Sequence, residues 1–244
     1  MPDRVALVTG GNHGIGLASA RALARDGFKV AVTYLRFEAP ERDLPAEYHE
    51  DRRQDAPFGD VRVEADLRDA ASPARVFDEV ERDLGPVSVL VNNASGWARD
   101  SFVEADQPLT AESAEMQLLV DARGGALMIA EYARRFAGDW GRVISLTSGG
   151  PMGFPGQVSY GAAKAALENY TMSASIELAP RGITANVVYP PVTDTGWVTD
   201  DVRRFVAEST DHWHVAQPEE VAEVIAWLCS PAADLVTGNI LRLR

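Results

Sequence analysis

The sequence has one cysteine among its 244 residues, Cys229 in the segment EVIAWLCSP. A single thiol forms no internal disulfide, and no group of cysteines is present to bind zinc. Because the neighbouring residues are apolar with helical spacing, we expect a buried and unreactive thiol. Histidine is also scarce, with four residues. His212 and His214 have no third ligand near them in the sequence, so we expect no metal site.

Long apolar runs are absent as well. No stretch of about 20 apolar residues, the length that spans a bilayer, occurs in the sequence. The N-terminal segment MPDRVALVTGG leads directly into a strand-like run and lacks the basic region, apolar core and cleavage site of a signal peptide. These absences predict a cytoplasmic protein that does not associate with membranes.

Positive charge is in deficit. The 23 lysines and arginines face 36 acidic residues, which gives a net charge of −13. Nucleic acids and anionic membranes require a basic surface, so neither is expected as the main partner. The hydrophobic fraction of 46% and the charged fraction of 24% are typical of a soluble globular protein, and the length suits one large domain or two small ones.

Short β-branched runs alternate with helical stretches along the whole chain. Several of these runs are apolar on both faces, as expected for a parallel sheet that helices cover on both sides. The alternation predicts one doubly wound α/β domain over residues 1–244, with a seven-stranded, mostly parallel sheet. The candidate strands are Arg4–Val8, Lys29–Thr33, Asp60–Val63, Val87–Val91, Arg142–Leu146, Ile183–Val188 and Asn239–Leu243.

Helices are predicted between these strands. Ser72 and Pro73 are typical of an N-cap and a first helical turn, and Gly85 ends the helix that they open. Pro218 opens another helix, whose first turn is acidic as the helix dipole favours. Further helical patterns cover about Thr110–Phe136 and about Val158–Ala179, and the polar residues 37–59 are expected to form a solvated crossover.

A glycine-rich segment, TGGNHGIGLASARALA, follows the first predicted strand and opens a helix. Gly10, Gly14 and Gly16 permit a tight turn and let backbone N–H groups approach a pyrophosphate at the positive end of the helix. Apolar residues flank the segment on both sides, with VALV before it and helical spacing from Ile15 onward. The segment therefore predicts a dinucleotide-binding loop, with a wider spacing between its first glycines than the commonest fingerprint has.

Several motifs in this order resemble the short-chain dehydrogenase/reductase family over essentially the whole chain. TGGNHGIG at 9–16 is similar to the TGxxxGxG pattern of that family, and VNNAS at 91–95 is similar to its NNAG motif, with Ser95 in place of the glycine. Ser148, Tyr160 and Lys164 match its Ser…YxxxK group, with the typical gap of 160 − 148 = 12 residues. The resemblance implies a Rossmann-type oxidoreductase of the branch that resembles 3-oxoacyl-carrier-protein reductases.

Tyr160 and Lys164 are four residues apart in YGAAK, so a helix places them on one face. A lysine ammonium about 5 Å from a tyrosine hydroxyl favours the phenolate by about 3 kcal/mol at an effective dielectric constant near 20. Taken alone, such a pair is more often a solvated surface pair. Ser148 follows the strand RVISL at the carboxyl edge of the sheet, where open α/β folds bind ligands, and it favours a proton-handling site.

The resemblance implies a role for each of these residues. In the reduction that the family catalyses, the nicotinamide gives a hydride to a carbonyl carbon, Tyr160 gives its proton to the oxygen, and Ser148 holds that oxygen. Lys164 favours the phenolate and binds the nicotinamide ribose. Asp121, in MQLLVDARGGALM, stands where the family carries an Asn that supports a water linked to the lysine. An Asp there either relays the proton or turns away as a bystander.

The end of the second strand favours NADP(H) over NAD(H). Members of the family that use NAD carry Asp where Tyr34 stands, and Arg36 can pair with a 2′-phosphate. His13 occupies a position that is often basic in relatives that use NADPH. The alternative is that Arg36 is only a solvated charge. The other cofactor-binding residues that the resemblance implies are Gly10, Asn12, Gly14, Ile15, Gly16, Asp66, Leu67, Asn93, Ala94, Ser95, Tyr160, Lys164, Pro190, Val192 and Thr195.

Bulky residues near these motifs are candidates for the walls of a substrate pocket, and they favour an apolar or aromatic carbonyl substrate. Ordinary packing is the alternative for each of them. Pro191 replaces a glycine that is usual in the family, so the turn after the sixth strand must be reshaped. The candidate wall residues are Trp97, Met152, Phe154 and Trp197.

Three functions stay open at this point. The first is an NADPH-dependent reductase of free carbonyl compounds, and the second is a 3-oxoacyl-carrier-protein reductase, for which Arg134 and Arg135 could dock an acidic carrier. The third is a dinucleotide-binding sensor without turnover, against which the intact Ser, Tyr and Lys group speaks. The helices at 110–136 and 158–179 resemble those that pair between subunits in the family, so a homodimer or homotetramer is expected.

Overall fold

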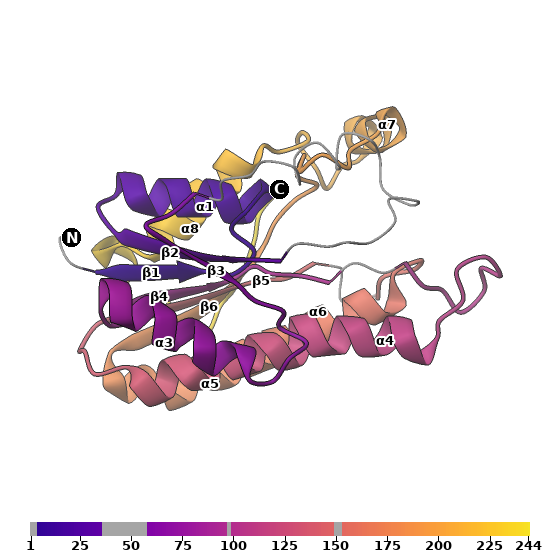
Figure 1. Cartoon of the computed structure of the whole chain (residues 1–244). Helices are drawn as coiled ribbons and strands as arrows, with labels where there is room; N and C mark the ends of the chain where they lie inside the picture. The colour runs from indigo at the N-terminus through magenta and orange to yellow at the C-terminus, as the bar shows by residue number, and fades with distance from the viewer. Residues whose placement is uncertain (1–3, 36–57, 97–98, 149–152) are drawn as a thin grey trace.

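The computed structural model describes residues 4–35, 58–96, 99–148 and 153–244 (Figure 1). Within these residues, seven strands form one sheet in the order β3-β2-β1-β4-β5-β6-β7, and every neighbouring pair is parallel. The predicted doubly wound α/β fold is confirmed. The strands are β1 (Val5–Val8), β2 (Lys29–Tyr34), β3 (Val61–Glu64), β4 (Val87–Asn92), β5 (Gly141–Leu146), β6 (Ile183–Tyr189) and β7 (Ile240–Arg242).

Helices cover both faces of the sheet (Figure 1). Successive residues of β1 point to opposite faces of the sheet and are buried on both. Val5 and Leu7 belong to one hydrophobic cluster, and Ala6 and Val8 belong to the other. The first cluster lies under α3 (Ser72–Leu84), α5 (Gly125–Arg135) and α6 (Val158–Glu177), and the second lies under α1 (Gly14–Arg25) and α8 (Pro218–Leu228). Strands buried on both faces therefore read as continuous apolar runs in the sequence.

The order of the strands reverses between β1 and β4. The chain moves outward from β1 to β2 and β3, returns to β4 on the other side of β1, and then continues outward to β7. The loops that leave the carboxyl ends of β1 and β4 therefore diverge to opposite faces of the sheet. Such a switch point is where open α/β folds bind their ligands.

The predicted helix at 110–136 is present, with one irregular segment. It begins with α4 (Ala111–Gln117), continues through a π-helical stretch, η1 (Leu118–Gly124), and ends with α5. Thr110 caps its N-terminus, where its hydroxyl accepts from the Ser113 amide at 3.1 Å. The π-helical stretch was not predicted, and it contains Asp121. A π turn inside a helix often marks a functional site.

The helix α3 has the predicted bounds, but Ser72 is not its N-cap. Ala71 occupies that position without a side-chain capping bond, and Ser72 is the first helical residue and is buried. The preceding turn is held by Asp69, whose carboxylate accepts from the Ala71 amide at 2.9 Å and whose carbonyl accepts from the Ser72 amide at 3.1 Å. Asp69, and not Ser72, therefore binds the free amides at the start of α3.

The other predicted segments and the remaining helices complete the described fold. The helix that Pro218 was predicted to open is α8, and Gly85 ends α3 as predicted, with a φ of 96°. The predicted crossover at 37–59 lies almost entirely outside the described residues. No helix of the described residues is long and apolar enough to cross a membrane. The additional helices are α7 (Asp200–Glu208) and the short turns η2 (Ala179–Arg181) and η3 (Pro231–Ala233).

Candidate active site

The glycine loop leaves β1 at the switch point and has no room for larger residues. Gly10 and Gly14 adopt φ values of 64° and 52°, a region that L side chains rarely enter. A Cβ atom on Gly16 would lie 2.2 Å from the carbonyl oxygen of Gly10 and 2.4 Å from the side-chain nitrogen Nδ2 of Asn93. The loop is thus a backbone cradle at the start of α1, which fits the pyrophosphate of a dinucleotide.

Thr9 joins this loop to the loop after β4. Its hydroxyl accepts from the amides of Asn93 and Ala94, both at 3.0 Å. The side-chain amide of Asn93 in turn donates to the carbonyl oxygens of Thr9 and Gly10, both at 3.0 Å. The two predicted motifs, TGGNHGIG and VNNAS, therefore form one bonded unit. The role of Thr9 was missed from the sequence, although it is the first residue of the glycine motif.

The segment after β6 closes over the glycine loop. A Cβ atom on Gly14 would lie 2.9 Å from the Thr195 side chain, so Thr195 borders the cradle. The segment is fixed by backbone bonds to Ala216, whose amide donates to the Val192 carbonyl at 2.9 Å. Pro191 is accommodated here, where its carbonyl accepts from the Thr193 hydroxyl at 2.9 Å. Pro190 and Val192 are half-buried.

The predicted adenosine end of the site is only partly described. Tyr34 ends β2 and is half-buried, but Arg36 lies outside the described residues. The Asp66 carboxylate is bound by the Arg68 guanidinium at 2.6 Å, a contact that lowers the pKa of Asp66. Leu67 is buried against Gly124. The contacts of these four residues with the adenosine end of a cofactor therefore stay predictions, as do the cofactor contacts of Asn12, His13 and Ile15 in the glycine loop.

The helix α6 carries Tyr160 and Lys164 to the carboxyl edge. Its N-terminus is held by the buried Asp100, whose carboxylate accepts from the Ser159 amide at 2.9 Å and from the Ser113 hydroxyl of α4 at 2.8 Å. No sequence motif indicated this role for Asp100. The Lys164 ammonium lies 5.6 Å from the centre of the Tyr160 ring, so the two side chains share a face as predicted.

Asp121 meets Lys164 directly. Their side chains are 0% and 3% exposed, and the carboxylate oxygen Oδ1 lies 2.7 Å from the ammonium nitrogen Nζ. Asp121 therefore does not turn away from the site. Burial lowers the pKa of Lys164, but the attraction of Asp121 and Tyr160 outweighs burial and raises that pKa above its ordinary value. The lysine is a buried cation throughout the physiological range.

A hollow of about 760 Å³ lies beside α6 at the same edge of the sheet. Ser148 and Phe154 line it, and the Phe154 ring lies 5.7 Å from the Tyr160 ring, centre to centre. Its wall is mostly apolar, and neither Tyr160 nor Lys164 is among the residues that line it. Trp197 is 40% exposed and does not line this hollow, while Trp97 and Met152 lie outside the described residues. Other lining residues include Phe102, Leu109, Leu118, Ala162 and Ala165.

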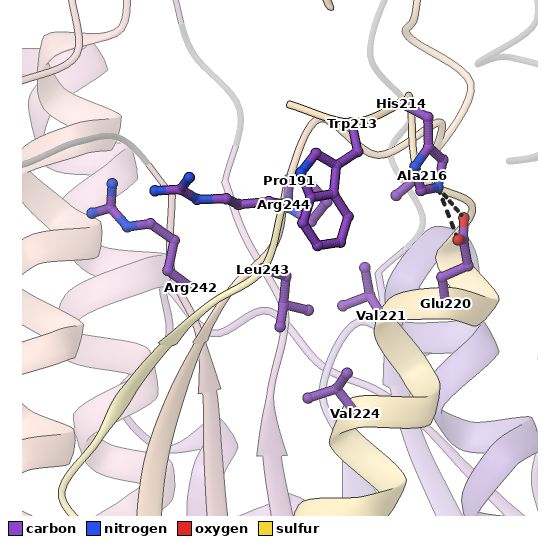
Figure 2. A pocket seen from close by; sticks show the side chains of 10 residues that line it. All are labelled: Pro191, Trp213, His214, Ala216, Glu220, Val221, Val224, Arg242, Leu243 and Arg244. Atoms are coloured by element: carbon purple, nitrogen blue, oxygen red, sulfur yellow. Dashed lines mark hydrogen bonds and ion pairs between the residues drawn. The ribbon is translucent and has the colours of Figure 1, made fainter. Parts of the chain in front are cut away.

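A second hollow of about 370 Å³ lies on the α8 side of the sheet (Figure 2). Val221 and Val224 point from α8 toward Leu243, and the Trp213 indole lies close to the end of the chain (Figure 2). His214 pairs with Glu220, with Nε2 2.8 Å from one carboxylate oxygen. None of the Ser, Tyr and Lys group lines this hollow. Among the described residues, no group of three or more His, Cys, Asp or Glu side chains could hold a metal ion.

Two other expectations from the sequence have a clear outcome. The thiol of Cys229 is fully buried, and burial raises its pKa to about 12, as expected for an unreactive cysteine. The patch of Arg134 and Arg135 is not freely basic, because Glu131 pairs with both guanidinium groups. Arg135 is also 2.8 Å from Asp78. These ion pairs therefore argue against a docking site for an acidic carrier protein at this patch.

Comparison with known proteins extends the likeness over the whole chain. A family model described as enoyl-(acyl carrier protein) reductase matches residues 10–243. The chain is 35% identical to the uncharacterized oxidoreductase YjdA of Bacillus subtilis, across 98% of this chain and 94% of that protein. It is also 35% identical to the 3-oxoacyl-[acyl-carrier-protein] reductase MabA of Mycobacterium tuberculosis, across 98% and 90%. The solved angucycline C-6 ketoreductase LanV with bound NADP has a TM-score of 0.80 at 32% identity, across 99% and 94%.

Proposed function

The chain belongs to the short-chain dehydrogenase/reductase family of NAD(P)-dependent oxidoreductases, and from this premise we propose that it reduces a carbonyl compound with NADPH, or oxidises the matching alcohol. The observation that carries the proposal is the placement of Tyr160 and Lys164 on one face of α6, beside the hollow that Ser148 lines. A proton donor, a buried cation and a hydroxyl would thus act together at the edge where this fold binds its ligands.

The residues of the switch point would hold the dinucleotide. Gly10, Gly14 and Gly16 form the cradle for its pyrophosphate at the N-terminus of α1, and Thr195 borders that cradle. Lys164 would bind the nicotinamide ribose. When bound, the reduced dinucleotide supplies a hydride to the carbonyl carbon.

The chain supplies the proton and the charge stabilisation. Tyr160 would donate its hydroxyl proton to the carbonyl oxygen as negative charge develops on that oxygen. Ser148 would donate a hydrogen bond to the same oxygen and hold it beside Tyr160. The apolar wall around Ser148 and Phe154 would exclude water from the reacting atoms.

Two features support NADPH over NADH. β2 ends at Tyr34, so it carries no carboxylate at the position that would bind the ribose hydroxyls and repel a 2′-phosphate. Arg36 follows two residues later in the sequence and is the proposed partner of that phosphate. LanV, a ketoreductase of the same fold and 32% identical, binds NADP.

A free carbonyl compound is favoured as the substrate over one bound to a carrier protein. The likeness to MabA keeps the 3-oxoacyl-carrier-protein substrate open. The acid pairing of Arg134 and Arg135 speaks against it, because a carrier protein is acidic and needs a basic docking surface. A sensor without turnover is the other alternative, and the complete set of Ser148, Tyr160 and Lys164 argues against it.

The test is a substrate panel followed by NADPH absorbance. The purified protein is incubated with NADPH and aliphatic, aromatic and polycyclic ketones, and in parallel with a 3-oxoacyl group on its carrier and on a small thiol. We expect oxidation of NADPH with apolar free ketones. Faster turnover on the carrier-bound substrate would support the second function. Tight binding of NADPH without oxidation across the panel would support the sensor and contradict the proposal.

A further inference from the structure

The buried Asp121 is the acceptor at the centre of a polar cluster that extends to the exposed Ser95. Its Oδ1 accepts from the Ser95 hydroxyl at 2.7 Å and from the Lys164 ammonium at 2.7 Å, and its Oδ2 accepts from the Gly96 amide at 2.9 Å. The Ser95 hydroxyl also lies 3.0 Å from the Gly96 carbonyl. The loop after β4 and the helix α6 thus supply three donors to one carboxylate.

The backbone around the cluster lets the Gly96 amide approach the Asp121 carboxylate. A Cβ atom on Gly96 would lie 2.6 Å from the side-chain oxygen of the buried Gln117, so glycine lets the amide approach the carboxylate. The π-helical stretch η1 places Asp121 opposite α6. Ser95 and Asp121 are both positions where the sequence departs from the family motifs, and the structure shows that their side chains are hydrogen-bonded to each other.

The cluster changes the charge that faces Tyr160. Among the described residues, the titratable groups that face Lys164 are Asp121 from η1 and Tyr160 from the preceding turn of α6. The loop after β4 contributes only the neutral Ser95 hydroxyl and Gly96 amide. The ammonium and the carboxylate together carry no net charge. A lone ammonium would favour the Tyr160 phenolate, and a neutral pair favours it much less.

We propose that Asp121, fixed by Ser95 and Gly96, is a positioning residue that holds the Lys164 ammonium in a neutral ion pair and thereby moves proton donation by Tyr160 to higher pH. The catalytic part of this inference rests on the proposed reductase function, whereas the ion pair does not. Because reduction uses the protonated Tyr160 and oxidation uses the phenolate, we expect the pair to shift the pH profiles of both directions.

The chain has only two lysines, Lys29 and Lys164, which allows a direct test without turnover. The protein is labelled with [¹³Cε]lysine, and the two signals are followed by NMR from neutral pH to about pH 11, across the ordinary lysine pKa of about 10.4. The exposed Lys29 at the start of β2 is the internal reference, and K29R assigns the signals. We expect the Lys164 signal to titrate at higher pH than the Lys29 signal.

Three variants separate the contributions of Asp121 and Ser95 to the pKa of Lys164. In D121N the Lys164 signal should titrate lower by about 1–3 pH units, the range that loss of a close opposite charge gives. S95A should give a smaller shift in the same direction. The double variant should match D121N, because Ser95 acts through Asp121 and the effects are not additive. If D121N does not fold, S95A alone decides the question. Lys164 and Lys29 signals that titrate together in the wild-type protein would overturn the ion pair.

The catalytic consequence is read from the pH profile of ketone reduction. D121N should move the alkaline limb of kcat to lower pH by about half to one unit, since the ammonium then lacks its counter-charge. D83N is the matched control, because Asp83 pairs with Arg82 on the exposed end of α3 and should leave the profile unchanged. An unmoved limb in D121N, with a shifted Lys164 signal, would overturn the role in proton donation. If the wild-type protein turns over no ketone, the proposed function fails, while the NMR result still decides the ion pair.

Discussion

At the scale of single residues, the proposed preference for NADPH depends on the end of β2. Tyr34 offers no carboxylate there, and Arg36 is a full positive charge two residues further along the chain. A 2′-phosphate is present in NADPH and absent from NADH, so a side chain that binds it affects one cofactor and not the other.

We therefore expect R36A to weaken NADPH binding by about 1.5–3 kcal/mol, the scale of a hydrogen bond to a charged group. NADH binding should be almost unchanged. Calorimetric titration of both cofactors measures the two effects. R82A, at an exposed position on α3, is the control and should change neither. Equal losses for NADPH and NADH in R36A would contradict phosphate recognition by Arg36.

The residues of the site differ in how far the sequence could predict them. Tyr160 and Lys164 are four positions apart on one helix, and local spacing alone predicts that they share a face. The contact between Ser95 and Asp121 spans 26 residues and two elements, so it depends on the packing of η1 against the loop after β4. Spacing within a helix says nothing of such a contact. The resemblance to the family pointed to Asp121, but only the structure places its carboxylate on Lys164.

At the scale of elements, the region 111–135 shows where helical periodicity is insufficient. The sequence predicts one long helix, and the structure contains a π-helical stretch within it, at Leu118–Gly124. Tertiary contacts fix that stretch. A Cβ atom on Gly125 would lie 2.7 Å from the Leu167 side chain, and one on Gly124 would lie 3.0 Å from Leu67. These two glycines permit the close approach of α6 and of the loop after β3, and this packing cannot be read from a period of 3.6.

The N-terminus of α6 depends on Asp100. Burial alone raises the pKa of this carboxyl, but hydrogen bonds from Ser159, Ser113 and Val158 outweigh burial and lower it. A lowered pKa in the folded state means that the charged Asp100 stabilises the fold above the ordinary aspartate pKa of about 3.9. That stabilisation is lost as the pH falls through the lower pKa of the folded protein.

D100N should therefore lower the free energy of unfolding by about 1–3 kcal/mol at neutral pH, because donors of α6 and α4 lose a charged acceptor. The difference from the wild-type protein should shrink as the pH falls below about 3.9. Urea unfolding at several pH values measures it. D106N, at an exposed position in the same connection, is the control. A difference that stays constant down to acid pH would contradict the linkage to Asp100.

At the scale of the whole molecule, the fold class follows from a simple property of the sequence. Strands buried on both faces must be apolar throughout, and parallel neighbours must be joined by crossovers, so strands and helices alternate. All seven predicted strands are present within one or two residues of their expected ends. The strand order is less accessible from the chain itself. The local pattern would be the same for another order of the strands, so only the structure gives that order.

The outer surface of α6 and η1 carries apolar side chains that this chain leaves uncovered. Leu118 of η1 is 44% exposed, and Tyr170 and Ile176 of α6 are 49% and 77% exposed. We expect a twofold-symmetric homodimer or homotetramer in which these helices pair between subunits. Light scattering measures the mass, and I176E should shift it toward the monomer, while F205E on α7 should not. A wild-type monomer of 26.4 kDa at micromolar concentration would contradict this assembly.

Proton donation by Tyr160 underlies the proposed carbonyl reduction, and Tyr160→Phe removes the proposed donor. The substitution keeps the aromatic ring against Phe154 and removes only the hydroxyl. Turnover of the best ketone from the panel is measured with saturating NADPH, together with NADPH binding by fluorescence. We expect a loss of turnover of at least about 100-fold, the low end for a general acid, with cofactor affinity almost unchanged. A variant that kept more than about a tenth of the wild-type turnover would contradict it.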